Sequence, residues 1–121
     1  MKILLVDDSN TMRRIQKNTL KQIGYEDVIE AGDGLEALDA LKANSDVNLV
    51  LLDWNMPNMD GITCLKTIKA DDGLKATPVI MVTSESEKSR IIEAIQSGAA
   101  NYVVKPFQPE TLKEKIVATV G

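Results

Sequence analysis

Two adjacent carboxylates, Asp7 and Asp8, directly follow an apolar run at residues 3–6. A third acid, Asp53, follows another apolar run at residues 49–52. Like charges that lie close together raise each other's pKa, so a cluster of acids needs a compensating positive charge. Mg²⁺ is a hard cation that binds carboxylate oxygens, water and phosphate oxygens. If the two runs are neighbouring strands, the three acids predict a magnesium site.

A hydroxyl and an ammonium group stand at the ends of two further apolar runs. Thr83 ends the run at residues 78–83, and Lys105 comes directly after the run at residues 101–104. A carboxylate beside a divalent cation, with an ammonium opposite, is suited to accepting a phosphoryl group, because this transfer depends on positioning and on neutralising the phosphoryl oxygens. Asp53 stands alone before an open loop, so it is the predicted nucleophile. The adjacent pair of acids is better suited to metal binding.

Each of these residues also has an ordinary explanation. An acid after a strand often caps the next helix, where it accepts hydrogen bonds from free amide groups. A single threonine or lysine at such a position is most often a solvated surface residue. The conjunction of three acids, a hydroxyl and a lysine at the ends of strands is what favours a chemical site. Arg13 and Arg14 are interpreted as a solvated helix face.

Five short apolar runs alternate with five segments of helical spacing. The runs are rich in Val, Ile and Leu and barely alternate in polarity, which is typical of parallel strands covered on both faces. Strands are expected at residues 2–6, 27–31, 49–52, 78–83 and 101–104. Helices are expected at residues 11–23, 35–43, 62–70, 87–97 and 110–120. The repeats predict a doubly wound α/β fold, with its ligand site beyond the carboxyl ends of the strands.

Composition restricts the classes of function. The chain of 121 residues suits one domain, at 1–121, and its net charge of −4 argues against nucleic-acid binding. The sequence has no histidine, which removes the usual zinc ligand and general base. The apolar run before Asp7 is too short for a signal peptide or a membrane span, so we expect a cytoplasmic protein without membrane contact. Cys64 is the only cysteine and is expected to be a buried thiol.

Four stretches together resemble response-regulator receiver domains, most closely the stand-alone chemotaxis response regulators of the CheY type. These stretches are VDDSNTMRRI, LLDWNMPNMDG, VIMVTSE and GAANYVVKPF, and the resemblance extends along the whole chain. The resemblance implies a flavodoxin-like fold, with five parallel strands in the order 2-1-3-4-5 and helices on both faces. It also implies a monomeric receiver without an output domain, which signals by contact with other proteins.

The resemblance assigns a role to each predicted site residue. Asp53 would accept a phosphoryl group from a phosphohistidine on a partner kinase, catalysing only its own modification. Asp8 and Asp53 would bind Mg²⁺ together with the backbone carbonyl of Asn55, and Asp7 would help through water. Lys105 would contact Asp53 at rest and a phosphoryl oxygen afterwards, and its peptide bond to the following proline is expected to be cis.

Further positions would connect phosphorylation to a response. Thr83 would move its hydroxyl onto the phosphoryl group, and Tyr102 would then move inward. Asn55 and Glu85 would set the lifetime of the phosphate. Ser84 stands where many relatives carry Ala, so it bears on that lifetime too.

The expected partner surface is formed by the last two helices and the strand between them. The flagellar motor switch protein is the expected target, and a phosphatase is a possible further partner. A phosphate-sink or relay receiver would use the same residues. An aspartyl phosphohydrolase resembling the haloacid dehalogenases would need an acid two residues after the nucleophile, where this chain has Asn55. An adaptor that has lost the chemistry would have a damaged site position, and none is damaged.

Overall fold

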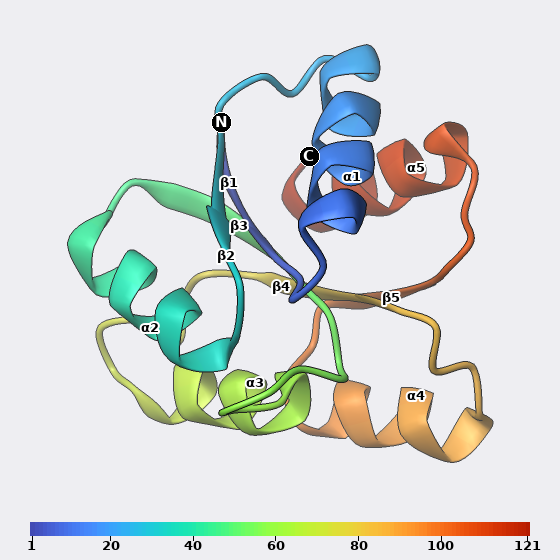
Figure 1. The fold of residues 1–121 in the computed structure, drawn as a ribbon. Coiled ribbons are helices and arrows are strands. Elements are labelled where there is room, and N and C mark those ends of the chain that lie inside the picture. Colours follow the sequence, from blue (N-terminus) through green and yellow to red (C-terminus); the bar gives the residue numbers. More distant parts are fainter.

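The computed structural model describes residues 1–121, in which strands and helices alternate (Figure 1). The strands are β1 (Lys2–Val6), β2 (Val28–Ala31), β3 (Val47–Leu52), β4 (Val79–Thr83) and β5 (Asn101–Val104). The helices are α1 (Asn10–Gln22), α2 (Gly34–Ala43), α3 (Gly61–Ala70), α4 (Lys88–Gln96) and α5 (Pro109–Val120). All strand pairs are parallel and the order is β2-β1-β3-β4-β5, which confirms the predicted fold.

The largest difference from the predicted boundaries is at the start of β3. The apolar pattern predicts a strand from residue 49, but the strand begins at Val47, which pairs with Lys2 before a register shift. The Asn48 side-chain oxygen accepts a hydrogen bond of 2.8 Å from the Lys2 amide. Asn48 thus interrupts the apolar run while its side chain bonds to the neighbouring strand β1, which is why the hydrophobic pattern did not predict the first two residues of β3.

Helices cover both faces of the sheet. Figure 1 shows α1 and α5 on one side and α2, α3 and α4 on the other. Successive β1 residues alternate between the faces: Leu4 and Val6 belong to a core of 20 buried residues on the α2–α3–α4 side. Ile3 and Leu5 belong to a core of 10 buried residues on the α1–α5 side. Burial on both faces explains the continuous apolar runs of the sequence.

The helices are short, and the first three begin at side-chain caps. Ser9, Asp33 and Asp60 accept hydrogen bonds from backbone amides in the first turns of α1, α2 and α3. Such caps satisfy amide groups that have no partner within the helix. The longest helix has 13 residues, and none combines the length and apolar character that a membrane crossing requires.

Cys64 lies on α3 and is fully buried. Burial raises the pKa of its thiol to about 12, and the nearby acids Asp33 and Asp60 contribute to this rise. The thiol is therefore protonated at neutral pH and unsuited to nucleophilic chemistry. This confirms the prediction of a buried thiol.

Gln16 is an unusual residue in the α1 interface. Its side chain is 3 % exposed, and its amide nitrogen has no hydrogen-bond partner. A buried unsatisfied donor destabilises a fold, so Gln16→Leu is expected to raise the free energy of unfolding by about 1 kcal/mol. Urea unfolding measures this change, with Gln22→Leu at the exposed end of the same helix as the control. A Gln16→Leu protein that unfolds at lower urea than the parent would contradict the assignment.

Candidate functional site

Three carboxylates meet at the carboxyl edge of the sheet. Asp7 and Asp8 follow β1, and Asp53 follows β3, the strand beside β1. The Asp53 amide donates a hydrogen bond of 3.0 Å to the Val6 carbonyl, which extends the ladder to the acids themselves. One oxygen from each acid lies within 4.8 Å of the others. The predicted cluster is thereby confirmed.

The donor set of this cluster fits a hard divalent cation. All three groups are carboxylates, the oxygen ligands that Mg²⁺ prefers. Asp7 and Asp53 are buried, whereas Asp8 is exposed, so solvent reaches the cluster from the Asp8 side. Mg²⁺ usually keeps several water ligands, and this open side suits it. The contribution of the Asn55 carbonyl and the water-mediated contact of Asp7 stay predictions.

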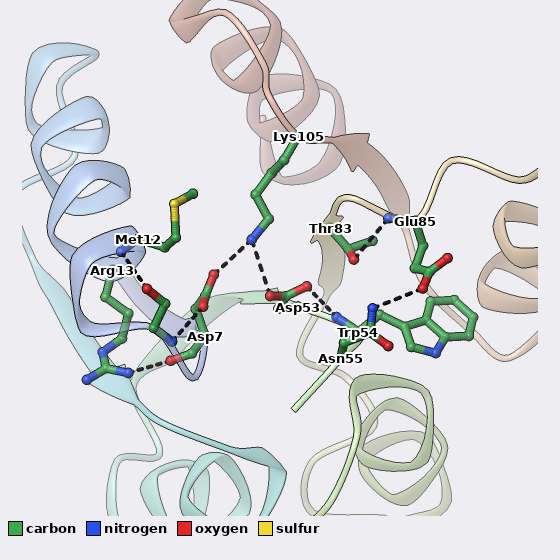
Figure 2. A network of polar contacts seen from close by, with 10 residues as sticks. Asp7, Met12, Arg13, Asp53, Trp54, Asn55, Thr83, Glu85 and Lys105 are labelled. Atoms are coloured by element: carbon green, nitrogen blue, oxygen red, sulfur yellow. Dashed lines mark hydrogen bonds and ion pairs between the residues drawn. The ribbon is translucent and has the colours of Figure 1, made fainter. Parts of the chain in front are cut away.

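Lys105 lies between the two buried acids (Figure 2). Its ammonium donates a hydrogen bond of 2.9 Å to Asp7 Oδ2 and one of 3.2 Å to Asp53 Oδ2. The contact with Asp53 is as expected, and the shorter contact with Asp7 was not predicted. One ammonium thus pairs with two buried carboxylates at once. The Lys105–Pro106 peptide bond is cis, as the resemblance implies.

The electrostatics of the site follow from burial and from these contacts. Burial raises the pKa of Asp53 above its ordinary value, while Lys105 and the Thr83 hydroxyl oppose the rise. Burial lowers the pKa of Lys105, but its contacts with Asp7 and Asp53 outweigh burial and raise the pKa overall. The Asp53 carboxylate also accepts a hydrogen bond of 2.7 Å from the Trp54 amide. Asp53 is therefore held in place by contacts on both of its oxygens.

The loop after β1 has a structural anchor that the sequence interpretation missed. Arg13 donates to the Asp7 carbonyl and to the Asn10 side chain, and it forms an ion pair of 3.1 Å with Glu30 on β2. Its side chain is only 16 % exposed, so the expectation that Arg13 belongs to a solvated helix face is wrong. The sequence feature that could have indicated this contact was the opposite charge of Glu30, on the neighbouring strand β2.

Asp7 itself does not cap α1. Its Oδ1 accepts a hydrogen bond of 2.9 Å from the Ser9 amide, outside the helix, while the Ser9 hydroxyl accepts one of 3.1 Å from the Met12 amide. The capping role therefore belongs to Ser9. Because one Asp7 oxygen is fixed by the loop, the other is free to face Lys105.

Glu85 connects the remaining predicted residues. Its amide donates to the Thr83 hydroxyl at 3.3 Å, and its carbonyl accepts from the Tyr102 hydroxyl at 2.7 Å. Its carboxylate accepts a hydrogen bond of 2.9 Å from the Asn55 amide group. The predicted switch and tuning residues are thus joined in one network at the end of β4. Their effect on phosphate lifetime stays a prediction.

Tyr102 already occupies an inward position. The residue is 8 % exposed, and burial together with Glu85 raises the pKa of its hydroxyl to about 12. The predicted inward movement therefore corresponds, in this structure, to a side chain that is already inside. The hydrogen bond to Glu85 explains how a phenol is accommodated there.

Ser84 is exposed beside the site. Together with Met12, Lys105 and Pro106 it lines an open recess of about 390 Å³. A small side chain at residue 84 leaves this recess open.

Gly61 lets α3 begin directly against the residues that follow β3. Its amide donates a hydrogen bond of 2.7 Å to the Trp54 carbonyl, and a Cβ atom at this position would lie 1.9 Å from the Asp53 carbonyl oxygen. Gly61→Ala is expected to destabilise the fold by about 1–3 kcal/mol, because backbone must shift to admit the methyl group. Thermal unfolding tests this, with Gly73→Ala, whose nearest contact is the Asp71 side chain at 3.3 Å, as the control. Equal losses in both variants would contradict the steric explanation.

Comparison with known proteins agrees with this geometry. Residues 3–117 match the response regulator receiver domain family. The chain is 51% identical to chemotaxis protein CheY1 of Helicobacter pylori over 121 residues, which is 100% of this chain and 98% of that protein. It superposes on chemotaxis protein CheY4 of Vibrio cholerae with a TM-score of 0.87 and 36% identity, covering 98% of this chain and 97% of the other. For a complex of CheX, CheY, BeF3 and Mg from Borrelia burgdorferi the TM-score is 0.90 and the identity 30%, covering 98% of this chain and 87% of the other.

The family match spans nearly the whole chain, and the carboxylate cluster, Thr83 and Lys105 lie together at the edge where the fold places a ligand. We conclude that the chain belongs to the response regulator receiver domain family and is of the CheY chemotaxis type.

Proposed function

We propose that this protein is a signalling switch that accepts a phosphoryl group on Asp53 from a histidine kinase. The observation that carries the proposal is the double contact of Lys105 with Asp7 and Asp53. It places a fixed cation beside a buried carboxylate whose other neighbours suit a magnesium ion. A bound Mg²⁺ would neutralise the phosphoryl oxygens during transfer.

The residues of the chain have separate tasks in the proposed step. An Asp53 carboxylate oxygen forms a bond to phosphorus while the bond between phosphorus and the donor histidine nitrogen breaks. That nitrogen keeps the electron pair of the broken bond, and the donor leaves as a neutral imidazole because its other ring nitrogen carries a proton. Lys105 stays protonated throughout, because its contacts with the acids raise its pKa, and its ammonium holds a phosphoryl oxygen. The chain would turn over only its own phosphoryl group.

The response is proposed to run through the network at Glu85. A phosphoryl group on Asp53 would attract the Thr83 hydroxyl, which now accepts a hydrogen bond from the Glu85 amide. Moving Thr83 changes the support of the loop between β4 and α4. Because the Glu85 carbonyl holds Tyr102, the change reaches β5 and then the face formed by α4, β5 and α5.

The proposed target is a component of the flagellar motor switch, and the protein would meet it in the cytoplasm. The similarity to chemotaxis proteins supports this choice. A phosphatase is a further proposed partner, since a complex containing CheX and CheY is among the similar structures. A motor-switch peptide should bind the protein treated with Mg²⁺ and beryllofluoride more tightly than the untreated protein. Equal binding would favour a phosphate-sink or relay receiver instead.

The central test is phosphotransfer from a labelled small-molecule phosphoryl donor, followed by mapping of the modified residue. The label is expected on Asp53 only, at no more than one equivalent, and only with Mg²⁺ present. Sustained release of phosphate far above one equivalent would support a phosphohydrolase. A label on another residue would overturn the proposal.

A further inference from the structure

Arg90 contacts the ring of Trp54, the residue after Asp53. This contact is not part of the sequence motifs or of the proposed switch. It lies in the first turn of α4, and its guanidinium carbon is 5.3 Å from the centre of the Trp54 ring. A cation within about 6 Å of an indole face is attracted by the electrons of the ring. Trp54 is 4 % exposed and follows Asp53 directly, so the contact joins α4 to the buried edge of the site.

The position of Arg90 calls for an explanation, because the start of a helix disfavours positive charge. Glu87, the residue before α4, makes no capping hydrogen bond with its side chain. Arg90 instead pairs with Glu93 at 3.6 Å, and Glu93 also pairs with Lys66 of α3 at 3.9 Å. Arg90 therefore lies between the Trp54 ring and the Glu93 carboxylate, which also pairs with Lys66 of α3.

Two connections lead from this contact to the rest of the site. The Trp54 amide donates a hydrogen bond of 2.7 Å to Asp53 Oδ1, so a displacement of Trp54 moves a donor of the phosphoacceptor. The positive charge of Arg90 also lowers the pKa of Tyr102, against the effects of burial and Glu85. Arg90 thus has an electrostatic interaction with Trp54, beside Asp53, and with Tyr102 on β5.

We propose that Arg90 is a positioning residue that couples the phosphoacceptor to α4 through the Trp54 ring. This inference rests on the proposed function, in which an anionic group binds at Asp53. Stacking of Arg90 fixes the first turn of α4 relative to Trp54, and its positive charge favours added negative charge at the site. Such coupling is reciprocal. If the Arg90 contact strengthens anion binding at Asp53, a bound anion also stabilises the position of α4.

The experiment compares the parent with Arg90→Ala, Arg90→Lys and Lys88→Ala. Lys88 has the same charge in the same turn of α4 and is exposed, so it is the matched control. Titration calorimetry with beryllofluoride in the presence of Mg²⁺ gives the dissociation constant without depending on Trp54 emission. Arg90→Ala is expected to weaken binding about twofold to fivefold, as the loss of one partly exposed cation–ring contact allows. Lys88→Ala is expected to bind like the parent.

Arg90→Lys separates stacking from charge. Its ammonium keeps the charge but lacks the planar group that stacks on an indole, so only part of the affinity should return. In ligand-free protein, Trp54 emission should move to longer wavelength in Arg90→Ala, since water reaches the ring. A merely stabilising role of Arg90 would lower the unfolding midpoint without changing the dissociation constant.

The outcomes distinguish this inference from the function on which it rests. A parent protein that binds no beryllofluoride with Mg²⁺ overturns the proposed function and the coupling together. A parent that binds, with an Arg90→Ala variant of equal affinity, overturns the coupling alone. An equal loss in Arg90→Ala and Lys88→Ala would show a general charge effect and would also overturn it.

Discussion

Asp53→Asn is expected to abolish phosphorylation of the protein by a small-molecule donor. The amide has nearly the shape of the carboxylate but lacks the negative oxygen that attacks phosphorus. The measurement is incorporation of labelled phosphate, read by intact-mass analysis after a timed reaction. Asp8→Asn is the comparison, because it removes a predicted metal ligand and leaves the nucleophile in place. It should slow the reaction without preventing it.

Asp53→Asn is also expected to stabilise the ligand-free protein at neutral pH. Burial raises the pKa of Asp53 above the ordinary value of 3.8, so the folded state binds the proton more tightly than the unfolded state. Stability from this group is therefore present below that value and is lost as the pH rises through the raised pKa. An Asn side chain does not titrate, so the variant loses no stability in this way as the pH rises. Urea unfolding on both sides of this window should show Asp53→Asn gaining on the parent as the pH rises.

Two results would contradict this account of Asp53. Phosphate incorporation in Asp53→Asn at the level of the parent would place the acceptor elsewhere. An Asp53→Asn protein that is less stable than the parent at neutral pH would show that Lys105 more than compensates the buried charge.

Lys105→Met is expected to destabilise the ligand-free protein by about 3 kcal/mol at neutral pH, because removal of one partner leaves buried charges uncompensated. The side chain is 12 % exposed and contacts Asp7 and Asp53, so two carboxylates lose their cation at once. Chemical unfolding measures the loss. Lys113→Met, on the exposed side of α5, is the control and should change little.

The pH dependence of Lys105→Met gives a second, independent check. The folded-state pKa of Lys105 is raised above the ordinary value of 10.5, so its stabilisation is complete below that value and is lost as the pH rises through the raised pKa. The parent should therefore lose stability in this alkaline range, and Lys105→Met should lack that step.

Magnesium should restore part of the stability of Lys105→Met, because a ligand at about 100 times its dissociation constant stabilises the folded state by about 2.7 kcal/mol. A variant as stable as the parent without magnesium would show that the acids need no internal cation. Equal destabilisation of Lys113→Met would show that overall charge, and not the site, is responsible.

Much of the fold was predictable from the apolar runs, and much of the site from the residues at the ends of those runs. Continuous apolar runs predicted a sheet covered on both faces, and parallel strands bring their carboxyl ends to one edge. That rule predicted Asp53 at the same edge as the acids of β1, and the strand order implied by the resemblance made β1 and β3 neighbours. The start of β3 was not predictable, since Asn48 interrupts the apolar pattern while its side chain binds the Lys2 amide.

Contacts made by long side chains were less predictable. Arg13 and Arg90 both occur in helices with polar surroundings, where a charged residue is usually solvated. Their partners, the Asp7 carbonyl and the Trp54 ring, lie elsewhere in the sequence. Neither hydrophobic spacing nor motif similarity reports which direction a long side chain takes. The second contact of Lys105, to Asp7, was missed for the same reason.

Glu85 divides its contacts between main chain and side chain. The carbonyl that holds the Tyr102 hydroxyl is present whatever residue occupies this position, whereas the bond to Asn55 requires the carboxylate. Under the proposed function, a substitution here would change how long a signal persists and leave the anchor of the output face intact. Under that proposal, the duration of the response and the surface that delivers it would be set by different atoms of a single residue.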